Sequence, residues 1–199
     1  MIPKSKRDFV WRFCCISTVA KIAVLGSGAG SNFQALLAEL GNDIVLVVSD
    51  QPDAGILKKA KASGIPAVVE KPGLDLSARI LKRLEGIDLV CLAGFMRLVK
   101  EPLLSSFPNR ILNIHPSLLP KYPGKLAWEQ ALADGAERTG CTVHFVDAGM
   151  DTGEVILRAE VPILQEDTPK SLHTRIQLEE YRIYPKAVKM VLERIRGDA

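Results

Sequence analysis

Residues 111–124 of the chain read ILNIHPSLLPKYPG, and this stretch decides the fold. Its first four residues are apolar and partly β-branched, which is typical of a short buried strand. The prolines that follow exclude a helix until the stretch ends at Gly124. We therefore expect a buried strand that ends at His115 and continues into a stiff loop.

His115 occupies the end of this expected strand, which is where open α/β sheets bind their ligands. Asn113 lies two residues earlier, so the period of a strand puts its amide on the same face as the imidazole. One alternative is a core histidine with a purely structural role beside a turn. The polar pair and the stiff loop together favour a functional site at His115.

A glycine-rich turn, GSGAGSN at residues 26–32, follows an expected strand at 21–25 and opens a helix. Ser31 and Gln34 have the spacing of a capping box. Glycines before a helix allow backbone N–H groups to converge on an anion, which the helix dipole also attracts. We interpret the turn as a phosphate site. The alternatives are an empty turn and a dinucleotide site with Asp50 on the ribose, although Ser31 replaces the third glycine of that pattern.

Strands and helices alternate along the rest of the chain. We expect strands at residues 43–48, 65–69, 87–93, 141–146 and 154–163, and helices at 53–63, 75–85, 126–133 and 167–180 and from Pro185 onward. This alternation indicates an α/β fold, with a mostly parallel twisted sheet and helices on both faces. Parallel strands end at one edge, so the glycine turn, residues 94–98 and His115 should line one crevice. We expect one domain at 21–199 after an N-terminal extension at 1–20.

The composition narrows the possible functions. The chain has 199 residues, of which 47% are hydrophobic and 25% are charged, and this composition is typical of a globular protein. The net charge of +3 comes from mixed charges without a long basic run, so we expect small-molecule and not nucleic-acid partners. No apolar run suggests a membrane span. The four cysteines lack C-x-x-C spacing, which predicts reduced thiols, no metal site and a cytoplasmic location. Nothing in the sequence predicts a particular oligomeric state.

A loop rich in aspartate and glycine, DAGMDTG at residues 147–153, separates two expected strands. Such loops are usually solvated turns, and Asp147 fits that interpretation. Asp151 has a different context, because its carboxylate can approach His115 if the last strands lie against the sheet. There it would stabilise the imidazolium and raise the pKa of His115.

Several motifs resemble those of the phosphoribosylglycinamide formyltransferases, and the likeness covers nearly all of the chain from Lys21 onward. They are GSN at 30–32, LAGFMR at 92–97, NIHPSLLP at 113–120, GCTVHFV at 140–146, DTG at 151–153 and EYRIYP at 180–185. The resemblance implies a single-domain, Rossmann-like formyltransferase fold. It also implies transfer of a formyl group from 10-formyltetrahydrofolate to phosphoribosylglycinamide in purine biosynthesis, without a metal.

The resemblance further implies roles for individual residues. The catalytic set would be Asn113, His115 and Asp151. The phosphoribosyl substrate would be held by Gly30, Ser31, Asn32, Gln177 and Glu180. The folate pocket would be lined by Met96, Arg97, Leu98, Val99, Asp147, Ala148, Gly149 and Met150. Protonated His115 and the Asn113 amide would donate to the formyl oxygen, while Asp151 keeps His115 charged and assists proton transfer.

The chain departs from the family pattern in two places. Members often carry a histidine within the segment that reads KLAW here, residues 125–128. A folate-contacting arginine is also missing upstream, where Arg79 is a possible replacement. Four other functions remain open: hydrolysis of formyltetrahydrofolate, formylation of methionyl-tRNA, nicotinamide binding and folate binding without catalysis. The first two are expected to need a further domain.

Overall fold

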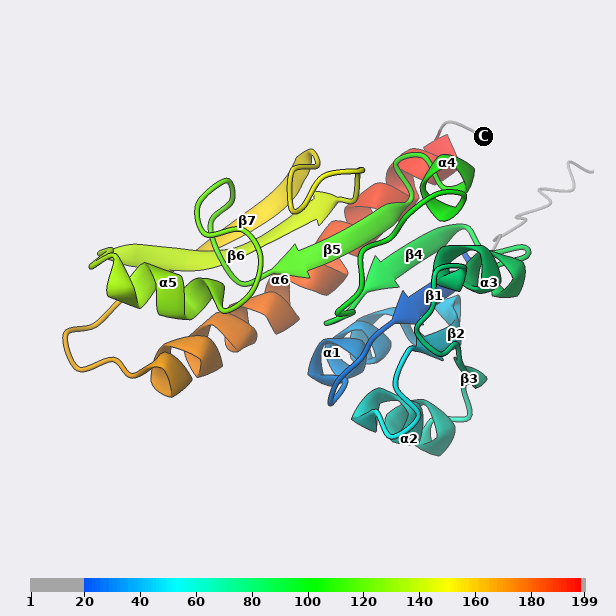
Figure 1. Ribbon diagram of the computed structural model, residues 1–199, viewed down its shortest axis with the longest axis horizontal. Coiled ribbons are helices and arrows are strands. Elements are labelled where there is room, and N and C mark those ends of the chain that lie inside the picture. The colour runs from blue at the N-terminus through cyan, green and yellow to red at the C-terminus, as the bar shows by residue number, and fades with distance from the viewer. Residues whose placement is uncertain (1–19, 198–199) are drawn as a thin grey trace, which may run out of the picture.

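The computed structural model describes residues 20–197. The expected N-terminal extension therefore lies outside the described residues, except for Ala20. A seven-stranded sheet runs through the molecule in the order β3-β2-β1-β4-β5-β6-β7 (Figure 1). Among residues 20–197 no helix combines the length and the apolar character needed to cross a membrane.

The elements follow the expected alternation of strands and helices. The strands are β1 (Ile22–Leu25), β2 (Ile44–Ser49), β3 (Ala67–Val69), β4 (Leu89–Leu92), β5 (Ile111–His115), β6 (Arg138–Phe145) and β7 (Val155–Pro162). The helices are α1 (Ser31–Leu40), α2 (Gly55–Ala62), α3 (Leu76–Arg83), α4 (Leu103–Ser106), α5 (Ala127–Ala133) and α6 (Pro169–Gly197), with a 3-10 turn η1 (Gly41–Asp43). Strands β1 to β5 pair in parallel, whereas β6 and β7 are antiparallel, so the mostly parallel sheet is confirmed.

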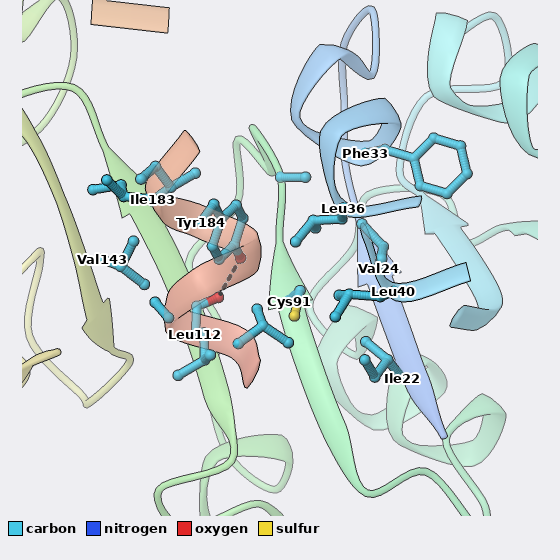
Figure 2. Packing of buried hydrophobic residues seen from close by; sticks show 14 of the residues in the cluster. Ile22, Val24, Phe33, Leu36, Leu40, Cys91, Leu112, Val143, Ile183 and Tyr184 are labelled. Carbon is cyan, nitrogen blue, oxygen red and sulfur yellow. Dashed lines mark hydrogen bonds between the residues drawn. The ribbon is translucent and has the colours of Figure 1, made fainter. Parts of the chain in front are cut away.

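Strands β1 and β4 in the middle of the sheet are apolar and buried at every position, so both of their faces are covered. In β1, Ile22 and Val24 join a cluster with residues of α1, α2 and α6, while Ala23 and Leu25 join a second cluster with α3 and α4. Figure 2 shows the first cluster, in which side chains of α1 meet β1 and β4. A strand buried on both faces cannot shift its register without moving apolar side chains. The strand ends that carry the site are therefore fixed.

The last two expected helices form one helix in the structure. Helix α6 runs for 29 residues and contains Pro185, so the prediction that a new helix starts at Pro185 was wrong. A proline inside a helix removes one hydrogen bond and costs about 3 kcal/mol. Its neighbours Ile183, Tyr184 and Ala187 are buried against the sheet, and this packing keeps the helix continuous.

The capping box expected at Ser31 and Gln34 does not form. Helix α1 is capped by Gly30, which adopts a left-handed φ of 75°, and no side chain bonds to the cap. A Cβ at Gly30 would lie 2.7 Å from the Cα of Ile56, so only glycine fits where α1 crosses α2. The Gln34 side chain instead accepts a hydrogen bond from Lys59 Nζ at 2.7 Å.

Candidate active site

The loops that follow β4 and β5 line one cavity at the carboxyl edge of the sheet, whereas no residue of the glycine turn after β1 lines it, contrary to the prediction. The glycine turn after β1 is bound to the loop after β4, since Ser27 N donates to Gly94 O at 3.0 Å. The Met96 amide in turn donates to Ser27 Oγ at 2.9 Å. The order of the sheet reverses between β1 and β4, and such points form the ligand crevice of open α/β sheets.

A cavity of about 570 Å³ opens at this edge. Its lining is largely apolar, with a few polar groups that include Asn113, His115, His144 and Asp151, as is typical of sites for small molecules. The expected folate residues that line it are Met96, Arg97, Leu98, Val99, Gly149 and Met150. Asp147 and Ala148 are not among its lining residues. The Asp147 carboxylate instead accepts hydrogen bonds from Gly149 N and Thr152 Oγ1, which fixes the loop.

His115 is almost fully buried at the end of β5, with 5% of its surface exposed. Both ring nitrogens lie near acceptors, Nε2 at 2.8 Å from Tyr122 O and Nδ1 at 3.4 Å from Asp151 Oδ2. The stiff loop after β5 supplies the first acceptor, and Ser117 Oγ closes that loop by donating to Lys121 O at 2.6 Å. The loop therefore orients the imidazole.

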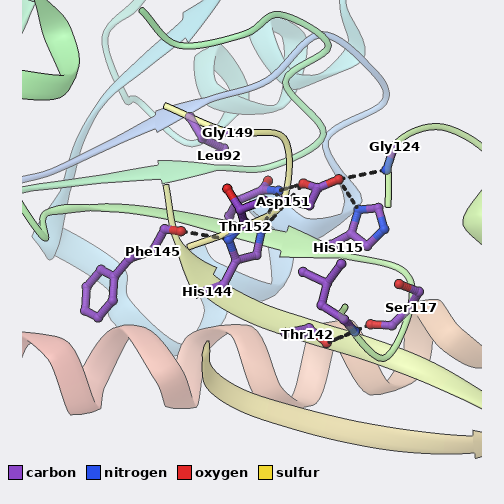
Figure 3. Close-up of polar contacts among 12 residues, drawn as sticks. Leu92, His115, Ser117, Gly124, Thr142, His144, Phe145, Gly149, Asp151 and Thr152 are labelled. Carbon is purple, nitrogen blue, oxygen red and sulfur yellow. Dashed lines mark hydrogen bonds and ion pairs between the residues drawn. The ribbon is translucent and has the colours of Figure 1, made fainter. Parts of the chain in front are cut away.

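Asp151 connects the loop after β6 to the catalytic histidine predicted from the sequence (Figure 3). Its backbone has a left-handed φ of 56°, a conformation that aspartate adopts more readily than most residues. The Oδ2 atom accepts a hydrogen bond from Gly124 N at 2.8 Å and faces His115. The Oδ1 atom lies 3.5 Å from Asn113 Nδ2. The structure thus brings Asn113, His115 and Asp151 together around one end of the cavity.

The pKa of His115 is shifted in the direction opposite to the one expected. Burial disfavours the imidazolium and lowers the pKa of His115 below 6.5, although the Tyr122 carbonyl and the Asp151 charge both raise it. The predicted effect of Asp151 is confirmed, since its charge raises the pKa of His115, but burial outweighs it and the net shift is downward. Burial raises the pKa of Asp151, but the hydrogen bond from Gly124 N and the two neighbouring imidazoles outweigh it, so the net shift is downward. In residues 20–197 no three His, Cys, Asp or Glu side chains are grouped to hold a metal ion.

His144 joins this cluster, although the sequence predicted only a strand residue there. It lies on β6 opposite Asn113, and its Nε2 is 3.2 Å from Asn113 Nδ2 and 3.7 Å from Asp151 Oδ1. The one sequence signal was its place in the GCTVHFV motif. No local pattern indicates that this strand pairs with β5, so the contact could not be inferred.

A second polar group lies between α1 and α6. Asn32 Nδ2 donates to Glu180 Oε2 at 2.9 Å, and Gln177 is one turn before Glu180 on α6. Glu180 is 5% exposed, and this burial raises its pKa to about 7, while the bond from Asn32 lowers it. One turn further on, the Tyr184 hydroxyl lies 2.9 Å from the carbonyl of Leu92, which lines the cavity. The second group is therefore one helical turn from the cavity wall.

Two charged side chains considered from the sequence form ion pairs with other side chains. Asp50 is 1% exposed and accepts a hydrogen bond from Arg97 Nε at 2.7 Å, which counts against binding of a ribose. Arg79 pairs with Glu70 and Asp75. The segment that lacks the family histidine places Trp128 in the cavity wall, where its ring stacks on His173 with centroids 3.8 Å apart.

Comparisons with known proteins agree with this architecture. Residues 20–188 match the formyl transferase family. A solved structure of glycinamide ribonucleotide transformylase 1 from Symbiobacterium toebii superposes with a TM-score of 0.82 at 48% identity, and covers 85% of each chain.

The curated relatives differ in length. The trifunctional purine biosynthetic protein adenosine-3 of Drosophila melanogaster is 43% identical over 86% of this chain, which spans only 14% of that protein. The phosphoribosylglycinamide formyltransferase of Bacillus subtilis is 38% identical over 86% of this chain and 94% of its own length. With a family match over residues 20–188 and a relative that aligns over 86% of this chain and 94% of its own length, this chain belongs to the formyl transferase family.

Proposed function

We propose that the chain transfers the formyl group of 10-formyltetrahydrofolate to the amino group of 5-phosphoribosylglycinamide, a step of purine biosynthesis. The observation that carries the proposal is the cluster of Asn113, His115 and Asp151 at a cavity with apolar walls. The names of the Bacillus subtilis relative and of the Symbiobacterium toebii structure support the same reaction. We expect these two small molecules to be the partners, and a cytoplasmic location stays a prediction.

Asn113 and His115 would stabilise the charge that develops during transfer. Attack of the amine on the formyl carbon places negative charge on the formyl oxygen, and hydrogen-bond donors aimed at that oxygen lower the barrier. Asn113 Nδ2 carries an N–H for this purpose. His115 Nε2 would supply the second donor by exchanging its present acceptor, Tyr122 O, for the formyl oxygen. Each such donor contributes on the order of 10² to 10³ in rate.

Asp151 would assist the movement of protons. Its carboxylate lies next to His115 Nδ1, so it favours the imidazolium as charge appears on the formyl oxygen. The attacking amine must also lose a proton, and a carboxylate at the edge of the cavity can accept it directly or through water. Help of this kind contributes about 10² to 10⁴ in rate.

The two substrates would occupy different parts of the edge of the sheet. The turn at Gly30, Ser31 and Asn32 offers the phosphate the N-terminus of α1, and the ammonium of Lys59 lies 3.3 Å from Gly30 O. Gln177 and Glu180 of α6 would bind the sugar. The folate would cover apolar side chains that solvent now reaches, which are Met96, Leu98, Leu126 and Met150.

The test is an assay with the purified 199-residue chain, 10-formyltetrahydrofolate and phosphoribosylglycinamide, in which release of tetrahydrofolate is followed. We expect release only when the amine is present. Release at the same rate without the amine would replace the proposal with hydrolysis. Tight folate binding with no release under either condition would replace it with a binding protein.

Two variants test the assignment of residues. His115→Ala and Asp151→Ala should each bind folate with near-native affinity and turn over at least about 10² times more slowly. Asp53→Ala is a matched control, because Asp53 is exposed in the loop between β2 and α2. Near-native turnover of either active-site variant would remove that residue from the mechanism.

A further inference from the structure

His144 makes contacts that determine which of its ring nitrogens carries hydrogen. The ring is buried, with 2% of the residue exposed. Its Nδ1 lies 2.7 Å from the carbonyl oxygen of Phe145. Figure 3 draws this contact as a dashed line. Its Nε2 lies 3.2 Å from Asn113 Nδ2. A carbonyl oxygen only accepts hydrogen bonds, so Nδ1 carries the hydrogen, and in the neutral ring Nε2 is then an acceptor.

The same contacts determine how the Asn113 amide is turned. With its NH₂ group toward His144, one hydrogen reaches the lone pair of His144 Nε2, and the nitrogen lies 3.5 Å from Asp151 Oδ1. The opposite orientation would put the amide oxygen against both the histidine lone pair and the carboxylate. Those contacts are repulsive, so the neutral imidazole and the carboxylate select one orientation of the amide.

The fold positions the Phe145 carbonyl oxygen, the acceptor that orients the His144 ring. The pairing of β6 with β7 shifts register between Val143 and His144, and such irregularities redirect side chains beside functional sites. Gly153 then passes close to Phe145, where a Cβ would lie 1.8 Å from the Phe145 oxygen. A side chain at position 153 would displace that carbonyl. Gly153 therefore preserves the contact between Phe145 O and His144 Nδ1, which determines the ring nitrogen that carries the hydrogen.

We propose that His144 is a positioning residue that acts through Asn113. As a neutral acceptor it holds one amide hydrogen of Asn113 and keeps the NH₂ group turned toward Asp151. The second amide hydrogen has only the long contact with Asp151, so it is available to the formyl oxygen. The inference rests on the proposed function, because it assigns Asn113 as a donor to that oxygen.

Two substitutions of His144 separate its accepting role from its packing role. The side-chain oxygen of Gln in His144→Gln can take the place of Nε2 and accept from Asn113. In His144→Asn the amide is too short to do so and remains near the Phe145 carbonyl. We expect His144→Asn to lose roughly 10- to 100-fold in kcat with KM nearly unchanged, and His144→Gln to stay within about threefold of the wild type. Equal losses in both variants, or a change confined to KM, would overturn the proposal.

A matched control comes from the same strand. Thr139 is 1% exposed on β6, and its hydroxyl has no hydrogen-bond partner among the described residues. Thr139→Val should therefore retain the kinetics of the wild type. Thermal unfolding of all three variants identifies any loss of folded protein, and kcat is referred to the folded fraction.

The coupling between the two residues gives a second readout. If His144 acts only through Asn113, the double variant Asn113→Ala/His144→Asn should be as slow as Asn113→Ala alone. A further loss equal to that of His144→Asn would assign His144 an independent role and overturn the proposal.

Nitrogen NMR of the side chain of His144 supplies a test that needs no substrate. The neutral tautomer with hydrogen on Nδ1 is expected at pH 7.5, and hydrogen on Nε2 would contradict the inference. A wild-type protein without formyl transfer would disprove the proposed function, whereas the wrong tautomer in an active enzyme would disprove only the role of His144.

Discussion

His115 illustrates how a buried side chain balances two opposing effects. Nε2 faces a carbonyl and Nδ1 faces a carboxylate, so only the imidazolium can donate to both. Burial opposes that charge and is the larger effect on its pKa. The free protein therefore holds a largely neutral ring whose protonated form has two partners ready. Such a ring suits a reaction in which negative charge appears nearby.

The balance can be measured by NMR titration of the three histidines. We expect His115 to titrate with a midpoint below 6.5 and the Asp151→Asn variant to titrate lower still, because the charge that favours the imidazolium is gone. Asp53→Asn, an exposed substitution, should leave the midpoint unchanged. A midpoint above 6.5, or an increase in Asp151→Asn, would contradict this account.

Helix α6 connects the glycine turn of α1 to the centre of the sheet. Along one face it carries Glu180, which binds Asn32, and Tyr184, whose hydroxyl lies 2.9 Å from Leu92 O and 3.2 Å from Leu112 O. The first carbonyl belongs to the last residue of β4, and the second to a residue within β5. A single helix therefore ties the proposed sugar site to β5, the strand that carries Asn113 and His115.

The hydroxyl of Tyr184 should contribute to stability through these two carbonyls. Tyr184→Phe keeps the buried ring but leaves both carbonyls without this donor. We therefore expect the free energy of unfolding, measured by urea denaturation, to fall by about 1–3 kcal/mol. Tyr181→Phe is the control, since this ring is only half-buried on the same helix and should change stability by less than about 0.5 kcal/mol. Equal stabilities of the two variants would show that the contact carries no energy.

Glu180 should make the protein less stable as the pH rises. The folded pKa is about 7 against 4.5 for the free side chain, so below pH 4.5 both states are protonated and burial has no cost. Between pH 4.5 and 7 the unfolded chain loses this proton while the folded protein keeps it, so stability falls by on the order of 3 kcal/mol across this range.

Glu180→Gln removes this ionisation. Denaturant unfolding should show the variant to be more stable than the wild type at pH 8 and similar to it at pH 4.5. Glu179→Gln, next to it and paired with Arg182, should show no such dependence on pH. A variant without a pH-dependent gain would mean that Glu180 is not ionised at a cost in the folded protein.

The molecule as a whole places its chemistry where the parallel half of the sheet joins the antiparallel half. Strand β5 pairs with β4 on one side and with β6 on the other, so residues from distant parts of the chain meet beside it (Figure 1). Both faces of the strand are covered by packed side chains. The site therefore depends on the integrity of the core beneath it.

Leu112 tests that dependence, because it is fully buried in the centre of β5. Leu112→Ala should destabilise the protein by about 2–5 kcal/mol, through lost burial and the cavity that remains. Leu178→Ala, at an α6 position that is 61% exposed, should change stability by less than about 0.5 kcal/mol. Calorimetric unfolding of both variants makes the comparison, and similar losses would contradict the assigned core.

The sequence by itself determined the alternation of strands and helices, the glycine turn and the polar pair Asn113 and His115 at a strand end. These features follow from periodicity and from the backbone limits of glycine and proline, which act over a few residues. The short helix α4, with only four residues, gave no such signal.

Tertiary structure alone decided the rest. It determined the partner of Asp50, the contact of His144 with Asn113, the direction of the pKa shift of His115 and the continuity of α6 through Pro185. Each depends on strand pairing or on burial among residues far apart in the chain. Desolvation and long-range packing exist only after folding, so a local pattern cannot contain them.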